Sequence, residues 1–386
     1  MTAKFLYRTF RQAVVGGRPY FAHLALTHRC NLRCRFCQIT SSPYPELDLD
    51  DMKRVIDRLD RMGVAVLSLT GGEPLLRPDF AAIIDYAAAK GLQVVVATNG
   101  TMPRAKYTEL IRSRVSEIGM SLDGVRGSDI PYSHTGPGIL GNIKFVNDNL
   151  PPGKRLRINI TISEANYDEV QNIVRYCTAA FPNARLWLNP VVVGAGRLRT
   201  STERRVPADY LSRVDSPLVL LPGFYKRACE AYSETGRYDW GCRAGERFLD
   251  IKPNGGLWIC QDHPCLERLN ILDPDFELRY RHADFSNRRH CGGCTYSCYL
   301  MAQLAFDPRN WADVARLWWA ISTRPGEACR NTADRLGWVA GLLHFAWLRL
   351  GARRFRRQRI RPRQDRAGDE AKLMPDRPLT VPQGSG

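Results

Sequence analysis

The feature that most constrains the fold is an alternation of short apolar segments with helical segments between residues 20 and 195. Apolar segments of this length are typical of strands buried on both faces of a parallel sheet. Repeated βα units build an open doubly wound sheet or a barrel, and six units are too few for a complete eight-unit barrel. The sequence therefore predicts an α/β fold. We expect strands at 21–27, 64–70, 92–99, 114–123, 155–163 and 184–193, and helices at 50–63, 78–91 and 167–181.

Polar and glycine-containing motifs follow the first four predicted strands. These motifs are THRC (27–30), TGGEP (70–74), TNGT (98–101) and SLDG (121–124). In parallel α/β folds the carboxyl ends of the strands share one rim, and the chemistry is found there. The sequence therefore predicts that the four motifs lie together on this rim.

Three cysteines, Cys30, Cys34 and Cys37, lie within eight residues in a C-x3-C-x2-C spacing. Structural zinc usually has four protein ligands, often as paired C-x2-C units, so this spacing disfavours zinc. Three thiolates on one loop suit three irons of a cubane cluster and leave the fourth iron open to a substrate or cofactor. No secretory signal is visible at the N-terminus, which predicts a reducing cytosol where twelve cysteines indicate metal or redox chemistry.

These motifs resemble those of the radical S-adenosylmethionine (SAM) superfamily. That family carries C-x3-C-x-aromatic-C after its first strand, with Phe36 in the aromatic place here, and GGEP after its second strand. The resemblance covers residues 18–195 and implies a partial (βα)6 barrel whose three cysteines hold a [4Fe–4S] cluster. It also implies that the cluster cleaves SAM to methionine and a 5′-deoxyadenosyl radical, which abstracts hydrogen from a substrate.

The resemblance also implies which residues contact SAM along the rim. Glycines let the backbone approach a ligand closely, and the carboxylate of Glu73 can orient the methionine ammonium group. SLDG is also an ordinary strand-ending turn, and on the fifth strand either Asn159 or Thr161 could contact the adenosyl group. The candidate cofactor-binding residues are Phe36, Gly71, Gly72, Glu73, Pro74, Thr98, Asn99, Ser121, Asp123 and Asn159.

A second group of cysteines lies in the distal half of the chain. A hairpin-like run with Asn254-Gly255 as its turn ends at Cys260, and HCGGCTYSC follows at 290–298. A cysteine-bearing hairpin followed by C-x2-C is also a common zinc ribbon, and the local spacing leaves the two readings even.

This region resembles the auxiliary-cluster extensions of radical SAM enzymes, called SPASM and, in shortened form, twitch. The run C-x2-C-x3-C lacks the x5 member of a full SPASM region, so the resemblance is closer to twitch. It implies one auxiliary [4Fe–4S] cluster that accepts an electron from the substrate radical. The implied ligands are Cys242, Cys260, Cys291 and Cys294. Cys265 and Cys298 are left over, and either could replace one of the four or help to hold a second cluster. We expect Cys177, Cys229 and Cys329 to pack as small apolar residues.

The C-terminal third is helical, aromatic and basic. Residues 349–366 hold nine arginines and one aspartate, a charge of +8 out of the total of +17. This concentration argues against a uniform nucleic-acid-binding surface. Residues 336–351 are either part of a helical cap on the barrel or an interfacial membrane helix, followed by arginines that suit anionic lipids.

The sequence predicts five parts: an N-terminal extension (1–19), a radical SAM core (20–200), a twitch-like domain (225–300), a helical aromatic segment (301–351) and a basic, then polar, disordered tail (352–386). We expect a cytoplasmic oxidoreductase, with peripheral contact to the inner membrane face as a further expectation.

The expected partners are an electron donor such as flavodoxin or ferredoxin and a small-molecule, lipid-linked or peptide substrate, with no nucleic acid. The alternatives are a radical SAM peptide maturase and a zinc-stabilised nucleic-acid-binding protein that would use the basic tail for phosphates.

Overall fold

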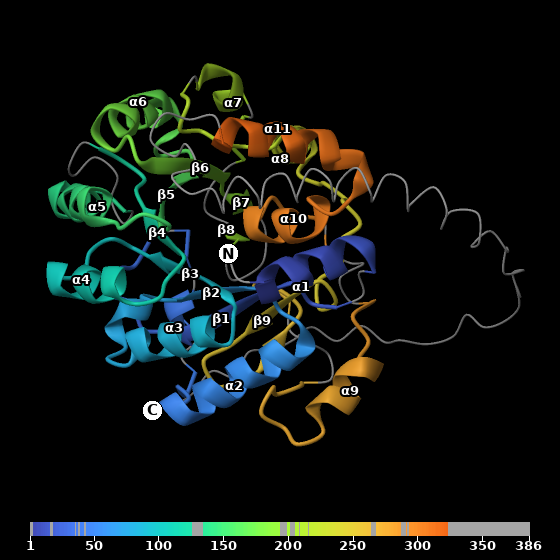
Figure 1. The fold of residues 1–386 in the computed structure, drawn as a ribbon. Coiled ribbons are helices and arrows are strands. Elements are labelled where there is room, and N and C mark those ends of the chain that lie inside the picture. The colour runs from blue at the N-terminus through green and yellow to red at the C-terminus, as the bar shows by residue number, and fades with distance from the viewer. Residues whose placement is uncertain are drawn as a thin grey trace, which may run out of the picture. The chain divides into compact units, whose positions relative to one another are not determined.

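One eight-stranded sheet organises the protein in this computed structural model (Figure 1). The strand order is β10-β9-β1-β2-β3-β4-β5-β6, with β1 to β6 parallel and a separate pair formed by β7 and β8. The strands are β1 (Phe21–Thr27), β2 (Val66–Gly71), β3 (Gln93–Thr98), β4 (Glu117–Ser121), β5 (Arg155–Ile162), β6 (Ala184–Pro190), β7 (Val192–Val193), β8 (Arg199–Thr200), β9 (Phe248–Ile251) and β10 (Leu257–Trp258).

The structure describes residues 3–15, 18–34, 36–37, 39–41, 44–125, 134–193, 199–200, 205–207, 209–214, 216–263, 268–286, 291 and 293–322. The α-helices in these ranges are α1 (Ala3–Val14), α2 (Leu49–Met62), α3 (Phe80–Ala89), α4 (Arg104–Arg112), α5 (Pro137–Asn149), α6 (Val170–Ala180), α7 (Tyr210–Arg213), α8 (Gly223–Thr235), α9 (Phe276–His282), α10 (Ser297–Leu304) and α11 (Trp311–Ser322). Short 3-10 helices are η1 (Ile39–Ser41), η2 (Pro74–Leu76), η3 (Tyr167–Glu169) and η5 (Pro308–Asn310).

The predicted α/β class is confirmed, and the six predicted strands are β1 to β6, which pair in parallel. The sheet is open: its edge strands β10 and β6 are not paired with each other. The helix predicted to end at Gly63 is α2, which Asp48 caps by accepting a hydrogen bond from the Asp51 amide. Gly63 has a φ of 95°, a left-handed conformation that favours glycine at a helix end.

Burial on both faces of every parallel strand was expected, and β5 shows that this expectation is wrong. Its residues alternate between buried and half-buried positions along the whole strand. Leu156 and Ile158 belong to the buried face, whereas Arg157 and Asn159 belong to the other. Polar side chains cannot be fully buried cheaply, so the second face of β5 is polar where an apolar layer was predicted.

The cysteine-bearing hairpin predicted around Asn254-Gly255 is present as β9 and β10, which pair antiparallel. Gly255 has a φ of 80° at the turn. Strand β9 also pairs in parallel with β1, so the hairpin extends the sheet that carries the rim motifs. One sheet therefore joins the two cysteine-containing halves of the chain.

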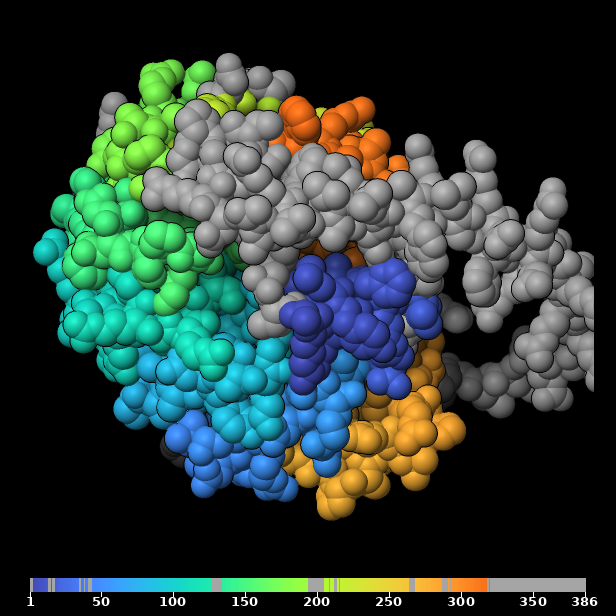
Figure 2. All heavy atoms as spheres, viewed as in Figure 1, coloured from blue at the N-terminus to red at the C-terminus, as the bar shows by residue number. Residues whose placement is uncertain are grey.

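Helix α10 contacts two strands that lie far apart in the order of the sheet, β9 and β6. Tyr299 stacks on Phe248 of β9 with ring centroids 4.2 Å apart, and the Ser297 hydroxyl donates to the Asn189 side chain of β6 at 2.8 Å. Helix α1 packs on α2 through an ion pair between Lys4 and Asp60, and Figure 2 shows α1 at the surface of the molecule.

Two sets of expectations for the C-terminal third have different outcomes. Helix α11 lies within the segment 301–351 that was predicted to be helical, whereas α10 begins before it, at Ser297. The membrane-helix candidate 336–351 and the tail 352–386 lie outside the described residues. In the ranges that the structure describes, no helix has the length and apolar character needed to cross a bilayer.

Candidate functional site

The four rim motifs lie at the carboxyl ends of β1 to β4, as the sequence predicted. The Gly72 amide donates to the Thr27 carbonyl at 2.8 Å, and the Glu73 amide donates to the Arg29 carbonyl at 2.9 Å. A Cβ on Gly72 would lie only 2.1 Å from the Arg29 carbonyl oxygen. Glycine is needed here because the GGEP turn and the start of the cysteine loop are in direct backbone contact.

Glu73 ties this turn to the end of β3. Its side chain is fully buried and accepts hydrogen bonds from the Leu75 amide at 3.1 Å, the Thr98 hydroxyl at 2.9 Å and the Asn99 amide at 2.7 Å. Burial raises the pKa of Glu73, although these hydrogen bonds favour the charged form. The carboxylate thus fixes the turn against β3, and contact with the methionine ammonium group stays a prediction.

Asn99 reaches from the end of β3 to the cysteine loop. Its side-chain nitrogen donates to the Asn31 side-chain oxygen at 2.8 Å and lies 3.7 Å from the Cys30 sulfur. The Leu32 amide lies 3.4 Å from the same sulfur. Two N–H groups are therefore directed at the Cys30 sulfur, an arrangement that suits a thiolate.

The end of β4 connects to the same loop through a histidine that the sequence analysis missed. His134 Nδ1 lies 2.7 Å from the Asp123 carboxylate, and its Nε2 lies 3.6 Å from the Cys34 sulfur. Burial opposes a charge on His134, but the Asp123 carboxylate outweighs it and raises the pKa of His134 to about 10. No local pattern links His134 to the SLDG motif eleven residues earlier.

The structure places the remaining rim candidates close to these groups. The Phe36 ring lies 6.3 Å from the His134 ring, and Pro74 begins η2. Ser121 of β4 is paired in register with Asn159 of β5. The Thr161 amide donates to the Asp123 carboxylate at 2.8 Å, so both candidates on β5 lie next to the rim.

The cysteine loop fits a cluster by its donor set. Cys30, Cys34 and Cys37 are partly exposed thiols on one loop, and N–H groups approach two of the sulfurs. Within the described ranges, no three Cys, His, Asp or Glu side chains converge closely enough to hold a metal ion as they stand. The chemistry of the donors fits an iron–sulfur cluster, and the loop must bring the three sulfurs together around it.

The second cysteine group comes from three separate segments of the chain, and an isolated bridge joins two of these segments. This bridge pairs Tyr238 with Gly293, so the chain leading to Cys242 runs beside the residues between Cys291 and Cys294. Burial raises the pKa of Cys260, and the nearby Asp262 and the Cys242 thiol raise it further. Cys242, Cys260, Cys291 and Cys294 are partly exposed or buried thiols, and Cys265 and His290 lie outside the described residues.

The other cysteines fall into two groups. Cys177 and Cys229 are completely buried, which confirms their prediction as small apolar core residues, whereas Cys329 lies outside the described residues. Cys298 lies on α10, where its sulfur is 3.1 Å from His23 Nε2 on β1.

Comparison with known proteins gives similarities in sequence. The family described as the radical SAM superfamily matches residues 24–193. An AdoMet-dependent heme synthase of Methanosarcina barkeri is 35% identical over 310 residues, which cover 70% of this chain and 87% of that protein. The subtilosin biosynthesis protein AlbA of Bacillus subtilis is 32% identical over 169 residues, but these cover 41% of this chain and only 36% of AlbA.

A solved structure is similar in fold. SuiB of Streptococcus suis bound to S-adenosylmethionine superposes with a TM-score of 0.54 at 15% identity, covering 71% of this chain and 68% of SuiB. At this sequence identity the similarity supports the fold, that is, the arrangement of the sheet and its helices, and gives no information on the substrate.

Proposed function

The chain belongs to the radical SAM superfamily, and on this premise we propose that it is an oxidoreductase that removes a hydrogen atom and an electron from its substrate. The observation that carries the proposal is the backbone contact between the GGEP turn and the start of the cysteine loop. This contact places the proposed SAM-binding turn beside the proposed cluster ligands Cys30, Cys34 and Cys37.

The residues of the rim have separate roles in this proposal. The three thiolates would hold an iron–sulfur cluster, which when bound would supply the electron for cleavage of SAM to methionine and a hydrogen-abstracting 5′-deoxyadenosyl radical. Gly71 and Gly72 keep the turn against the loop without side chains in between. Asn99 directs an N–H group at the Cys30 sulfur and orients Asn31. The remaining SAM contacts are proposed at Phe36, Pro74, Thr98, Ser121, Asp123 and Asn159.

An auxiliary [4Fe–4S] cluster, held by Cys242, Cys260, Cys291 and Cys294, is the proposed acceptor of the second electron. The bridge between Tyr238 and Gly293 supports this set of ligands, because it brings the segment leading to Cys242 next to the residues between Cys291 and Cys294. Strand β9 of the hairpin pairs with β1, so the hairpin that leads to Cys260 belongs to the same sheet as the strand that leads to the cysteine loop.

The identity of the substrate divides the proposal into two candidates. The similarity to a heme synthase over 87% of that protein favours a porphyrin. The similarity to AlbA, a bacteriocin biosynthesis protein, supports the peptide-maturase alternative over a shorter part of the chain. Family membership leaves the zinc-stabilised nucleic-acid-binding alternative without support.

The test is metal content and SAM cleavage after anaerobic purification and reconstitution. We expect about eight irons per chain, four for each cluster. Replacing Cys30, Cys34 and Cys37 by Ala should halve the iron and abolish formation of 5′-deoxyadenosine. Stoichiometric zinc without iron would overturn the proposal.

The double variant Cys291→Ala/Cys294→Ala tests which cluster SAM cleavage requires and which cluster substrate conversion requires. SAM cleavage should persist in this variant because it needs only the first cluster, whereas substrate conversion should stop. Adding an iron porphyrin or a peptide and measuring 5′-deoxyadenosine separates the two substrate classes, since the correct class stimulates its formation. Normal substrate conversion by the double variant would show that these cysteines do not serve an electron acceptor.

A further inference from the structure

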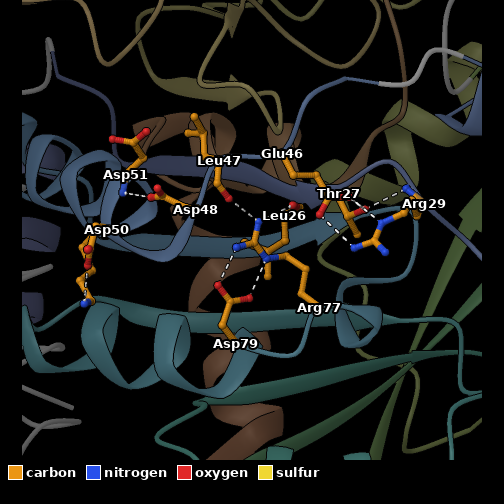
Figure 3. A network of polar contacts seen from close by, with 11 residues as sticks. Leu26, Thr27, Arg29, Glu46, Leu47, Asp48, Asp50, Asp51, Arg77 and Asp79 are labelled. Carbon is orange, nitrogen blue, oxygen red and sulfur yellow. Dashed lines mark hydrogen bonds and ion pairs between the residues drawn. The ribbon is translucent and has the colours of Figure 1, made fainter.

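The cysteine loop, residues 28–45, leaves the sheet after β1 and returns to it before α2. We call the four residues at its base the neck: Leu26 and Thr27 on the outgoing side, Glu46 and Leu47 on the returning side. Figure 3 shows that polar contacts join the two sides of the neck.

Arg77 makes the inner of these contacts. Its Nη1 donates to the Leu26 carbonyl at 3.2 Å and to the Leu47 carbonyl at 2.8 Å, so one nitrogen bridges the two sides of the neck. Asp79 holds the other edge of the guanidinium through two hydrogen bonds of 2.8 and 2.6 Å (Figure 3). The Arg77 side chain is only 5% exposed, so these contacts are shielded from water.

Arg77 also belongs to the proposed SAM-binding turn. It follows η2 directly, and its amide donates to the Pro74 carbonyl at 3.2 Å. A single side chain thus connects the turn to both sides of the neck. A guanidinium can do this because its planar fork directs several N–H groups at once, whereas a lysine ammonium lacks this geometry.

Glu46 makes the outer contact of the neck. Its carboxylate accepts a hydrogen bond from the Thr27 hydroxyl at 2.5 Å and two from Arg29, at 2.7 and 3.0 Å. The Glu46 side chain is 24% exposed and that of Arg29 is 62% exposed. Both ends of the cysteine loop are therefore joined by charge-assisted hydrogen bonds immediately above the bridge that Arg77 makes.

The neck is connected to the second cysteine region as well. The Leu47 amide donates to the Pro253 carbonyl at 3.0 Å, in the connection between β9 and β10. The returning side of the neck is thus held between the GGEP turn, through Arg77, and the hairpin that leads to Cys260.

We propose that Arg77 and Glu46 are positioning residues that close the neck of the cysteine loop and fix its thiols relative to the SAM-binding turn. Closing a loop at its base removes much of the conformational freedom of the residues within it. The three sulfurs then need only a local rearrangement to meet around a cluster. The inference rests on the proposed function, because it takes Cys30, Cys34 and Cys37 as the ligands.

The experiment compares Arg77→Lys, Arg77→Met and Glu46→Gln with the unaltered chain. Arg54→Met is the control, because Arg54 pairs with Asp51 on the exposed side of α2, away from the neck. Each protein is reconstituted with iron and sulfide, and three quantities are measured: the rate of iron loss to a chelator, the change in the electron paramagnetic resonance (EPR) signal of the reduced cluster when SAM is added, and the thermal midpoint.

We expect iron loss from both Arg77 variants to be about tenfold faster, the effect of losing one charge-assisted hydrogen bond. The SAM-induced change in the EPR signal should also be weaker. Glu46→Gln keeps the shape of a partly exposed side chain and should show the same effects to a smaller degree, even if an Arg77 variant folds poorly. Arg54→Met should behave like the unaltered chain.

Two results distinguish failure of this inference from failure of the proposed function. If the unaltered chain holds iron and responds to SAM while the Arg77 and Glu46 variants lose only thermal stability, the neck is merely structural and the inference is overturned. If the unaltered chain binds no iron at all, the proposed function itself is wrong, and the positioning role is lost with it.

Discussion

Replacing Asp250 by Asn should destabilise the sheet at the junction of β9 and β1. Asp250 forms an ion pair with Lys252 and accepts a hydrogen bond from the Gln261 side chain. Both charged side chains are only 1% exposed, and Asp250 is paired in register with His23 of β1. The substitution leaves Lys252 as a buried cation without its counter-charge.

Breaking a buried ion pair by removing one partner typically costs about 3–5 kcal/mol. Two groups reduce the loss here: the Lys252 ammonium lies 4.2 Å from the centre of the Trp258 ring, and an asparagine oxygen can still accept from Gln261. We therefore expect the free energy of unfolding to fall by about 3 kcal/mol, the lower end of that range.

The assay is urea denaturation of the metal-free, reduced chain, followed by far-ultraviolet circular dichroism. Combining Asp250→Asn with Lys252→Met should restore most of the lost stability, because the double variant has no buried charge left unpaired. A loss below about 1 kcal/mol in the single variant, or no recovery in the double variant, would refute the reasoning that the pair is shielded from water.

Three further predictions concern the rim and β4. His134→Phe removes the N–H group directed at the Cys34 sulfur. Because hydrogen bonds to sulfur favour the reduced state, the reduction potential of the first cluster should fall in an EPR-monitored titration. An unchanged potential would contradict this. Gly72→Ala places a Cβ 2.1 Å from a carbonyl oxygen of the cysteine loop. The turn or the loop must therefore move, and SAM binding should weaken by at least about tenfold in equilibrium dialysis. Burial opposes the charge of Glu117, but Arg157, Arg155 and Arg185 outweigh it and lower its pKa to about 2. The charge of Glu117 therefore stabilises the folded state above the usual pKa of 4.5, and this contribution is lost as pH falls towards 2. In urea denaturation at pH 7, the free energy of unfolding of Glu117→Gln should be lower than that of the unaltered chain by about 3 kcal/mol. Near pH 2 the two proteins should be nearly equal in stability.

The sequence was most informative where structure depends on neighbouring residues. Strand β1 has the predicted limits, 21–27, because most of its residues are apolar and buried. Helix α2 ends beside Gly63 because glycine adopts the left-handed conformation at little cost. The GGEP turn and the cysteine loop were placed on one rim by the general rule for parallel strands, and their backbone contact agrees with it.

Long-range pairings were not predictable in the same way. The hairpin around Asn254 was visible in the sequence, but no local pattern indicates that β9 pairs with β1. The same holds for Arg77, which reads as an ordinary polar residue after a turn and in the structure joins the two sides of the neck. His134 was missed because its two partners, Asp123 and Cys34, come from different strand ends.

The surroundings of Cys298 bear on which cysteines hold the proposed auxiliary cluster. Its sulfur lies 3.1 Å from His23 Nε2 on β1, and the next residue, Tyr299, stacks on Phe248 of β9. Moving Cys298 to a cluster would break both contacts and shift the start of α10 away from β6. Cys294 precedes α10 and follows Gly293, which is paired with Tyr238 in the segment leading to Cys242. These contacts of Cys298 are therefore a reason to keep Cys294 rather than Cys298 in the proposed ligand set, which stays a prediction.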